Sequence, residues 1–532
     1  MSVKLAVSGA AAEAVNRIVP QLVNDLVASR ITGGDATLWG PDAEDESAKR
    51  LGWVEAVSVG RPMIDDIYAL RDKLRADGIN HFVLGGMGGS SLAPEVITRT
   101  YGVELTVLDS TDPAQVQAAL ADRLTSTAVV ISSKSGSTLE TDSQKRIYEK
   151  FFTDAGIDPR ERIVIVTDPG SPLDVAARAA GYRVFNADPN VGGRYSALTA
   201  FGLVPSGLAG VDLAELLDEA EAVMVELAVD NESNPGLVLG AAIAGADPRK
   251  DKLGIVSDGT HILGFGDWAE QLIAESTGKL GTGILPVVLQ PGSPEIGEGL
   301  EDLQIVRLVG DWDDTKEVVE GEIEIAGSLG GQLLLWEYAT VVAGRLLGIN
   351  PFDQPDVEAA KVAARELIDN PTPPEAPAFT AGDVEVRGTE GVVTNSNDLA
   401  SVVSSLLSYL DDDGYVAIQA YADRTAYPEL AEMRERVAAR AKRPVTFGWG
   451  PRFLHSTGQF HKGGPAVGVF LQIIVVEDRD LQIPDRPFTF GELIRAQAAG
   501  DASVLAGHGR PVLSLTVSNP QVSLPLVLDA IG

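Results

Sequence analysis

Short apolar runs that alternate with segments of helical periodicity constrain the fold of this chain more than any other feature. Each run is rich in β-branched residues or is followed by turn-forming residues, which is typical of buried parallel strands in β-α-β units. The runs are residues 81–84, 105–109, 129–132, 163–167, 253–257, 286–289, 305–309, 415–419, 445–447, 467–476 and 512–517. The sequence therefore predicts an α/β protein with parallel sheets.

The spacing of these runs divides the 532 residues into successive blocks. Residues 1–60 are predicted to form a helical N-terminal segment, and residues 61–205 and 206–370 two α/β domains in series. The proline-rich stretch 370–377 is predicted to be a linker, because proline favours extended backbone and stops helices. Beyond it, residues 380–532 are predicted to form a third, C-terminal α/β domain.

Composition excludes several classes of protein. Lys and Arg total 42 and Asp and Glu total 76, which gives a formal net charge of −34 that repels nucleic acid and anionic membranes. The absence of cysteine excludes disulfides, thiolate catalysis and Cys-ligated metal sites. The sequence has no run of about 18 uninterrupted apolar residues, and we expect no signal peptide at its start. We therefore expect a cytoplasmic protein that binds neither nucleic acid nor membranes.

Two loops at predicted strand ends carry residues suited to binding phosphate. The glycine loop (residues 85–91) reads Gly-Gly-Met-Gly-Gly-Ser-Ser, and the serine loop (residues 132–138) reads Ser-Ser-Lys-Ser-Gly-Ser-Thr. The glycine loop lacks the dinucleotide fingerprint, because Ser91 stands where the third glycine belongs. A capping box from Ser137 to Glu140 would use one hydroxyl, which leaves the others for an anion. Because parallel strands end at one sheet edge, we predict a phosphate site there. Plain tight turns are the alternative.

A predicted helix over residues 266–278 carries a candidate base. Asp267 is its expected N-cap and Gly278 its expected C-cap. Gln271 and Glu275 lie one turn apart on the same face. A carboxylate in the last turn meets the negative end of the helix dipole, which favours its protonated form and suits a general base. A solvated surface residue is the alternative interpretation.

Three further features are candidates for a site. Lys361 interrupts the apolar face of a helix predicted over 355–369, either as a snorkelling side chain or directed into a site. Arg194 follows two glycines and can bind an oxyanion or pair with a surface carboxylate. The glycine-rich stretch 448–465 contains His455 and His461. We expect no metal there, because no carboxylate ligand is nearby in the sequence.

Taken in order, these motifs resemble those of the glucose-6-phosphate isomerases of the sugar-isomerase superfamily. Gly-Gly-Ser-Ser-Leu-Ala-Pro, Ser-Lys-Ser-Gly-Ser-Thr, Gly-Gly-Arg-Tyr-Ser and Glu-Ser-Thr-Gly-Lys occur in the family's order, and residues 349–361 resemble its closing signature. The resemblance covers about residues 55–370 and implies two sugar-isomerase-type αβα domains. Residues 380–532 resemble the C-terminal part of fused transaldolase–phosphoglucose isomerases.

The resemblance implies an aldose–ketose isomerase that interconverts glucose 6-phosphate and fructose 6-phosphate through a cis-enediolate, without metal or cofactor. Glu275 would move a proton between C2 and C1, Arg194 would stabilise the enediolate, Gln271 would lie beside the substrate and Lys361 would assist ring opening. The implied phosphate site consists of Gly89, Ser90, Ser133, Lys134, Ser135 and Thr138. The resemblance also implies a homodimer.

One element of the resemblance is missing. Family members carry a ring-opening histidine between the glutamate motif and the closing signature, but residues 285–353 contain none. We hypothesise that His461, or alternatively His455, supplies it from the third domain, with His455 otherwise beside the substrate. Two other functions stay open: an isomerase of another sugar phosphate, such as mannose 6-phosphate, and a non-catalytic sugar-phosphate-binding regulator. The combination of Glu275, Arg194 and Lys361 disfavours the regulator, because binding alone needs only the loops.

Overall fold

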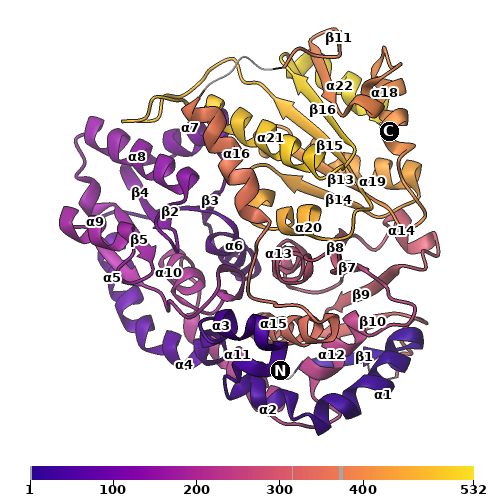
Figure 1. The fold of residues 1–532 in the computed structure, drawn as a ribbon. Coiled ribbons are helices and arrows are strands. Elements are labelled where there is room, and N and C mark those ends of the chain that lie inside the picture. Colours follow the sequence, from indigo (N-terminus) through magenta and orange to yellow (C-terminus); the bar gives the residue numbers. More distant parts are fainter. Residues whose placement is uncertain (1–2, 314, 371–374, 532) are drawn as a thin grey trace.

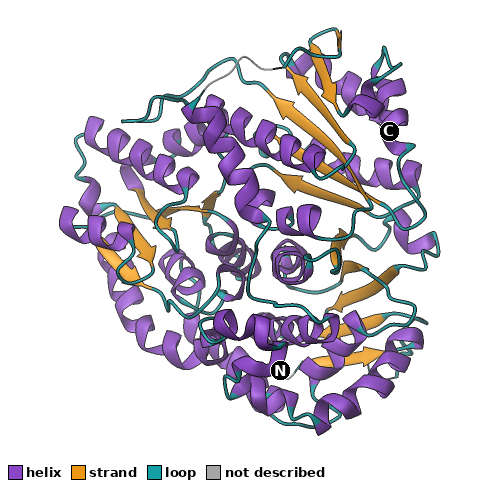
Figure 2. Ribbon diagram, viewed as in Figure 1, coloured by secondary structure: helices purple, strands orange, loops and turns teal. Residues whose placement is uncertain are grey.

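The structure is a computed structural model that describes residues 3–313, 315–370 and 375–531 (Figure 1). It is a mixed α/β protein in which three sheets are separated and surrounded by helices (Figure 2). The α/β prediction is confirmed, and each predicted apolar run lies in or overlaps a strand. The division into three independent domains stays a prediction.

The first sheet is entirely parallel, with strand order β3-β2-β4-β5-β6. Its strands are β2 (His81–Gly86), β3 (Thr106–Leu108), β4 (Thr127–Ser132), β5 (Ile163–Thr167) and β6 (Arg183–Asn186). The last of these had no predicted counterpart. The associated helices are α5 (Ile64–Ala76), α6 (Leu92–Thr100), α7 (Pro113–Ala121), α8 (Leu139–Asp154), α9 (Pro172–Ala180) and α10 (Ala200–Ala209). Because β2 and β4 are neighbours, the glycine and serine loops leave the sheet side by side.

The second sheet has the order β1-β10-β9-β7-β8 and takes its edge from the N-terminus. Its strands are β7 (Lys252–Asp258), β8 (Leu285–Leu289), β9 (Leu303–Val309), β10 (Ile323–Ala326) and β1 (Lys4–Val7), of which only β1 runs antiparallel to its neighbour. The remaining elements before residue 61 are α1 (Gly9–Asn24), α2 (Val27–Thr32), α3 (Pro41–Ser47), α4 (Ala56–Gly60) and short 3-10 turns. The segment predicted to be helical over residues 1–60 therefore starts with a strand, because β1 pairs with the edge of β10.

Helices occupy the centre of the molecule. The end-on helix in the middle of Figure 1 is α13 (Phe265–Thr277), which contacts α15 (Leu329–Leu347), α6 and α20 (Gly458–Gly463). The other helices of this part are α11 (Leu213–Leu227), α12 (Pro235–Ala244), α14 (Pro294–Gly297) and α16 (Val357–Asp369). Within the part of the chain that the structure describes, no helix has the length and apolar character needed to cross a membrane.

The third sheet has the order β11-β12-β16-β15-β13-β14. Its parallel strands are β13 (Tyr415–Tyr421), β14 (Val445–Trp449), β15 (Gly468–Val475) and β16 (Val512–Val517), and β12 (Val384–Gly388) and β11 (Phe379–Ala381) add an antiparallel edge. The helices are α17 (Glu390–Val393), α18 (Leu399–Leu407), α19 (Glu429–Ala441), α20, α21 (Phe490–Gly507) and α22 (Pro520–Ile531).

The boundary near residue 370 does not separate residues 206–370 from residues 380–532, here called the third block, in space. Helix α16 packs along α21, and a Cβ at Gly500 would lie 2.8 Å from the backbone nitrogen of Ala364. Residues 371–374 of the predicted linker lie outside the described residues. The last helix of residues 206–370 therefore packs with residues 380–532.

Two predicted helix caps are wrong. Helix α13 begins at Phe265 after Gly264, whose φ of +77° is a conformation that glycine adopts without strain, so Asp267 lies in the first turn instead. Helix α8 begins at Leu139 with Thr138 as its N-cap and no side-chain capping bond, so the Ser137–Glu140 capping box does not form. In both cases the helix begins at another residue than the side-chain pattern indicated, and no side-chain capping bond forms.

Close backbone contact brings the glycine loop against the segment that carries Arg194. The 3-10 turn η4 (Gly88–Ser90) packs on η7 (Gly193–Tyr195), and a Cβ at Gly89 would lie 1.9 Å from the carbonyl oxygen of Gly193. A Cβ at Gly88 would lie 2.7 Å from the carbonyl oxygen of His455. Glycine is required here because two other backbones occupy the space of a side chain.

We expect Gly89→Ala to destabilise the protein by about 1–3 kcal/mol, because the obstacle is backbone and the loop itself must move. The measurement is the midpoint of thermal unfolding. The matched control is Gly297→Ala in α14, where nothing lies within 4 Å of the added carbon. Equal midpoints for the two variants would show that the loops are not in the close contact described.

Candidate active site

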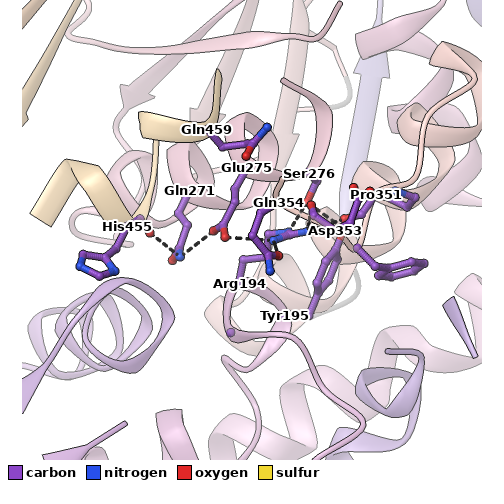
Figure 3. Close-up of polar contacts among 12 residues, drawn as sticks. Arg194, Tyr195, Gln271, Glu275, Ser276, Pro351, Asp353, Gln354, His455 and Gln459 are labelled. Atoms are coloured by element: carbon purple, nitrogen blue, oxygen red, sulfur yellow. Dashed lines mark hydrogen bonds and ion pairs between the residues drawn. The ribbon is translucent and has the colours of Figure 1, made fainter. Parts of the chain in front are cut away.

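The side chain of Arg194 connects three segments that are distant in the sequence (Figure 3). Its Nε donates to Ser276 Oγ at 2.9 Å, and its Nη1 donates to Gln354 Oε1 at 2.9 Å and lies 3.1 Å from Glu275 Oε1. Its Nη2 donates to the carbonyl oxygens of Pro351 at 2.8 Å and Asp353 at 3.0 Å. The side chain is only 3 % exposed, so the guanidinium is buried with all its donor nitrogens engaged.

The carboxylate of Glu275 lies between a cation and an amide. Arg194 faces Oε1, and Gln271 Nε2 donates to Oε2 at 3.0 Å. The same Nε2 donates to the carbonyl oxygen of His455 at 2.8 Å, so His455, Gln271, Glu275 and Arg194 form a row in Figure 3. Gln271 Oε1 is buried and has no hydrogen-bond partner among the described residues, which leaves an acceptor at the site. The one-turn spacing of Gln271 and Glu275 predicted from the sequence is confirmed.

The closing loop (residues 349–354) is held by two cations. Besides Arg194, Lys279 Nζ donates to the carbonyl oxygens of Asn350 at 2.7 Å and Asp353 at 2.6 Å and to Asp353 Oδ1 at 2.7 Å. Burial and the charge of Arg194 lower the pKa of Lys279 to about 8, against the opposing charge of Asp353. Lys279 is the last residue of the Glu-Ser-Thr-Gly-Lys motif, but no role was predicted for it from the sequence. Its position directly after the C-terminal end of α13 could have indicated that it acts near Glu275.

The serine loop forms its own hydroxyl network. Ser133 Oγ donates to Thr138 Oγ1 at 3.2 Å and accepts from the backbone nitrogen of Gly136 at 3.2 Å. Ser135 Oγ and Ser137 Oγ lie 2.9 Å apart. These groups gather before α8, where free backbone N–H groups and the positive end of the helix dipole favour an anion. In contrast, Lys134 turns to Asp168, with Nζ 2.6 Å from Oδ2.

A histidine from the third block reaches this region. The Nε2 of His455 lies 2.9 Å from Glu140 Oε1 in the first turn of α8, and both side chains are largely buried. Burial acts to raise the pKa of Glu140, but the charge and hydrogen bond of His455 and the more distant charge of Lys361 hold that pKa below its usual value. Glu140 was not predicted as a site residue, because its place in the sequence was interpreted only as part of a capping box.

His461 and Lys361 lie differently from the expectation. His461 is 2 % exposed, and its Nδ1 lies 3.0 Å from Tyr415 Oη while its ring packs against Phe470. Burial and the charges of Lys462 and Arg510 lower the pKa of His461 to about 3, so its ring is neutral near pH 7. We therefore correct the choice of His461 over His455. Lys361 is partly exposed beside Glu358, with Nζ 3.9 Å from Oε2, and does not contact Glu275.

Gln459 of α20 contacts the segments on both sides of the site. Gln459 Nε2 donates to the carbonyl oxygen of Gly278 at 2.9 Å and to Asp356 Oδ2 at 2.6 Å, and its Oε1 accepts from the backbone nitrogen of Asp356 at 2.9 Å. One side chain thus joins the end of α13 to the start of α16. In the described ranges, no group of three or more His, Asp or Glu side chains is arranged to hold a metal ion.

The chain is similar in sequence to proteins named glucose-6-phosphate isomerase. A probable glucose-6-phosphate isomerase of Natronomonas pharaonis is 29 % identical over 400 residues, which cover 64 % of this chain and 90 % of the relative. A glucose-6-phosphate isomerase of Acaryochloris marina is 30 % identical over 389 residues, which cover 62 % of this chain and 72 % of the relative. No family model matches the chain.

A comparison of structures agrees at the level of the fold. The crystal structure of a glucose-6-phosphate isomerase from Chlamydia trachomatis matches with a TM-score of 0.52 and 19 % identity, covering 66 % of this chain and 83 % of that one. The family resemblance read from the motifs is therefore confirmed by the sequence relatives.

We expect Lys279→Met to loosen the closing loop, because the methionine cannot donate the three bonds that Lys279 makes to Asn350 and Asp353. Amide hydrogen exchange in residues 349–354 should accelerate by roughly 10- to 100-fold. The control is Lys316→Met, which removes an exposed lysine paired with Glu324. Unchanged protection of residues 349–354 would contradict the anchoring role of Lys279.

Proposed function

The chain belongs to the glucose-6-phosphate isomerase family of enzymes, and from this premise we propose that it interconverts glucose 6-phosphate and fructose 6-phosphate. The observation that carries the proposal is the placement of Glu275, a 12 % exposed carboxylate held between Arg194 and Gln271. Proton transfer between adjacent carbons needs one fixed base and one fixed cation, and this pair provides both.

In the proposed mechanism, Glu275 removes the proton at C2 and returns it at C1. The enediolate oxygens that develop negative charge would be stabilised by the positive charge of Arg194, whose guanidinium is held in place before the reaction by its bonds to Ser276 and Pro351. Gln271 would orient the carboxylate and offer its free Oε1 to a substrate hydroxyl. Glu275 carries the carbon-bound proton, while the hydroxyl proton on O2 passes to the neighbouring O1 of the cis-enediolate, so that the aldehyde becomes a hydroxyl and the C2 hydroxyl becomes a ketone.

The substrate phosphate is proposed to bind at the serine loop. Ser133, Ser135 and Thr138 present hydroxyls at the start of α8, and Gly89 and Ser90 of the neighbouring glycine loop complete the site. Binding energy from this remote group would hold C1 and C2 against Glu275. Lys134, which pairs with Asp168, would contribute charge to the loop rather than a direct contact in the present arrangement.

Ring opening is proposed to use His455. Its bond to Glu140 orients one ring nitrogen, and the imidazole can then act as the general acid that gives a proton to the ring oxygen. Lys361, whose charge reaches this pair, would assist by stabilising Glu140 as an anion. The homodimer implied by the resemblance, like the cytoplasmic location, stays a prediction.

We expect Glu275→Gln to abolish exchange of the C2 proton with solvent, with a loss of roughly 10²–10⁴-fold in turnover, while sugar-phosphate binding persists. Exchange is measured with C2-deuterated glucose 6-phosphate, and with mannose 6-phosphate to test the competing substrate. The control is Glu219→Gln, a half-buried glutamate that accepts from the backbone nitrogen of Gly330. Exchange at the wild-type rate in Glu275→Gln would refute the assignment of the base.

We expect His455→Ala to slow turnover of ring-closed glucose 6-phosphate by at least tenfold, because the ring oxygen loses its proton donor. His461→Gln should instead lower the thermal midpoint while turnover per folded enzyme stays close to wild type, since that ring is part of the core beside Tyr415. The reverse pattern, with turnover lost in His461→Gln and kept in His455→Ala, would restore His461 as the ring-opening residue.

A further inference from the structure

Glu140 accepts a second hydrogen bond that the proposed function does not use. The Nε2 of Gln497, on α21 of the third block, donates to Glu140 Oε1 at 2.8 Å. The same carboxylate oxygen faces His455 Nε2 at 2.9 Å. Gln497 is 5 % exposed and Glu140 is 6 % exposed, so solvent does not compete for this contact.

A threonine fixes which way the Gln497 amide points. Thr111, just after β3 of the first sheet, donates its hydroxyl to Gln497 Oε1 at 2.7 Å and is fully buried. Because Oε1 accepts from Thr111, the other end of the amide must be the NH₂ group, and that group meets Glu140. Thr111, Gln497, Glu140 and His455 therefore form one directed chain of hydrogen bonds.

We propose that Gln497 is a positioning residue that holds the Glu140 carboxylate ionised and aimed at His455, with Thr111 setting the orientation of its amide. The inference deepens the proposed function and rests on it for the role of His455 in ring opening. It adds that the third block supplies the support of the histidine as well as the histidine itself.

The charges around Glu140 fit this role. From the C-terminal segment it faces His455, from α16 it senses the charge of Lys361, and within α8 its own backbone N–H bonds to it. Gln497 is the neutral donor from α21. A neutral donor stabilises the anion without placing a second positive charge beside the histidine. Loss of that donor therefore raises the pKa of Glu140.

The test compares Gln497→Leu and Thr111→Val with the wild type. The first removes the donor at similar volume, and the second leaves Gln497 in place but frees its amide to rotate. The control is Ser514→Ala, which removes a buried hydrogen bond to Gln472 elsewhere in the third sheet. Carbon-13 labelling of histidine gives only five side chains to follow by NMR, and His455→Ala identifies the His455 signal.

Protonation of Glu140 in acid changes the signal of the neighbouring His455 ring, and in Gln497→Leu this step should move to higher pH, with a smaller move in Thr111→Val. The acid limb of kcat/KM for ring-closed glucose 6-phosphate should move in the same direction, while Ser514→Ala matches the wild type. If this acid step stays at the wild-type pH in both variants, the proposal is overturned, even where the variants are less stable than the wild type. Because this titration needs no turnover, a wild-type enzyme without isomerase activity would refute the proposed function separately.

Discussion

The buried guanidinium of Arg194 is the interaction on which the rest of the site depends. A charge removed from water costs several kcal/mol unless its donors are satisfied, and here they are satisfied by α13, by the closing loop and by Glu275. Other groups hold these partners in turn. Lys279, for example, donates to the carbonyl oxygen of Asp353 in the closing loop. The site is therefore assembled as a unit, with little freedom to relax around a missing partner.

Backbone proximity determines how that unit is built. The carbonyl oxygens of Gly193 and His455 lie where side chains of Gly89 and Gly88 would be, so three chain segments meet without intervening side chains. In the proposed site, the carboxylate of Glu275 and the serine hydroxyls are then the groups that would face a ligand. The arrangement joins elements of all three sheets, which explains why the boundary near residue 370 has no counterpart in the packing of α16 on α21.

Strands and linear motifs were predictable because their signals are local. The buried runs 81–84 and 163–167 are continuous and apolar, and Gln271 and Glu275 follow from helical spacing alone. What failed depended on distant partners. Strand β1 forms because β10 offers an unpaired edge, and His455 rather than His461 reaches Glu140 because α20 turns the latter into the core. The link from Gln497 to Glu140 joins residues more than three hundred positions apart, and no local pattern could reveal it.

The antiparallel pairing of β1 with β10 has a consequence for biosynthesis. Lys4 pairs with Ala326, so β1 acquires its partner only after roughly 300 further residues have been made. At roughly 5–20 residues per second, that delay lasts tens of seconds. During this interval the nascent chain carries a short unpaired strand, and its lysine and its length of only four residues limit the chance of pairing with a neighbouring chain.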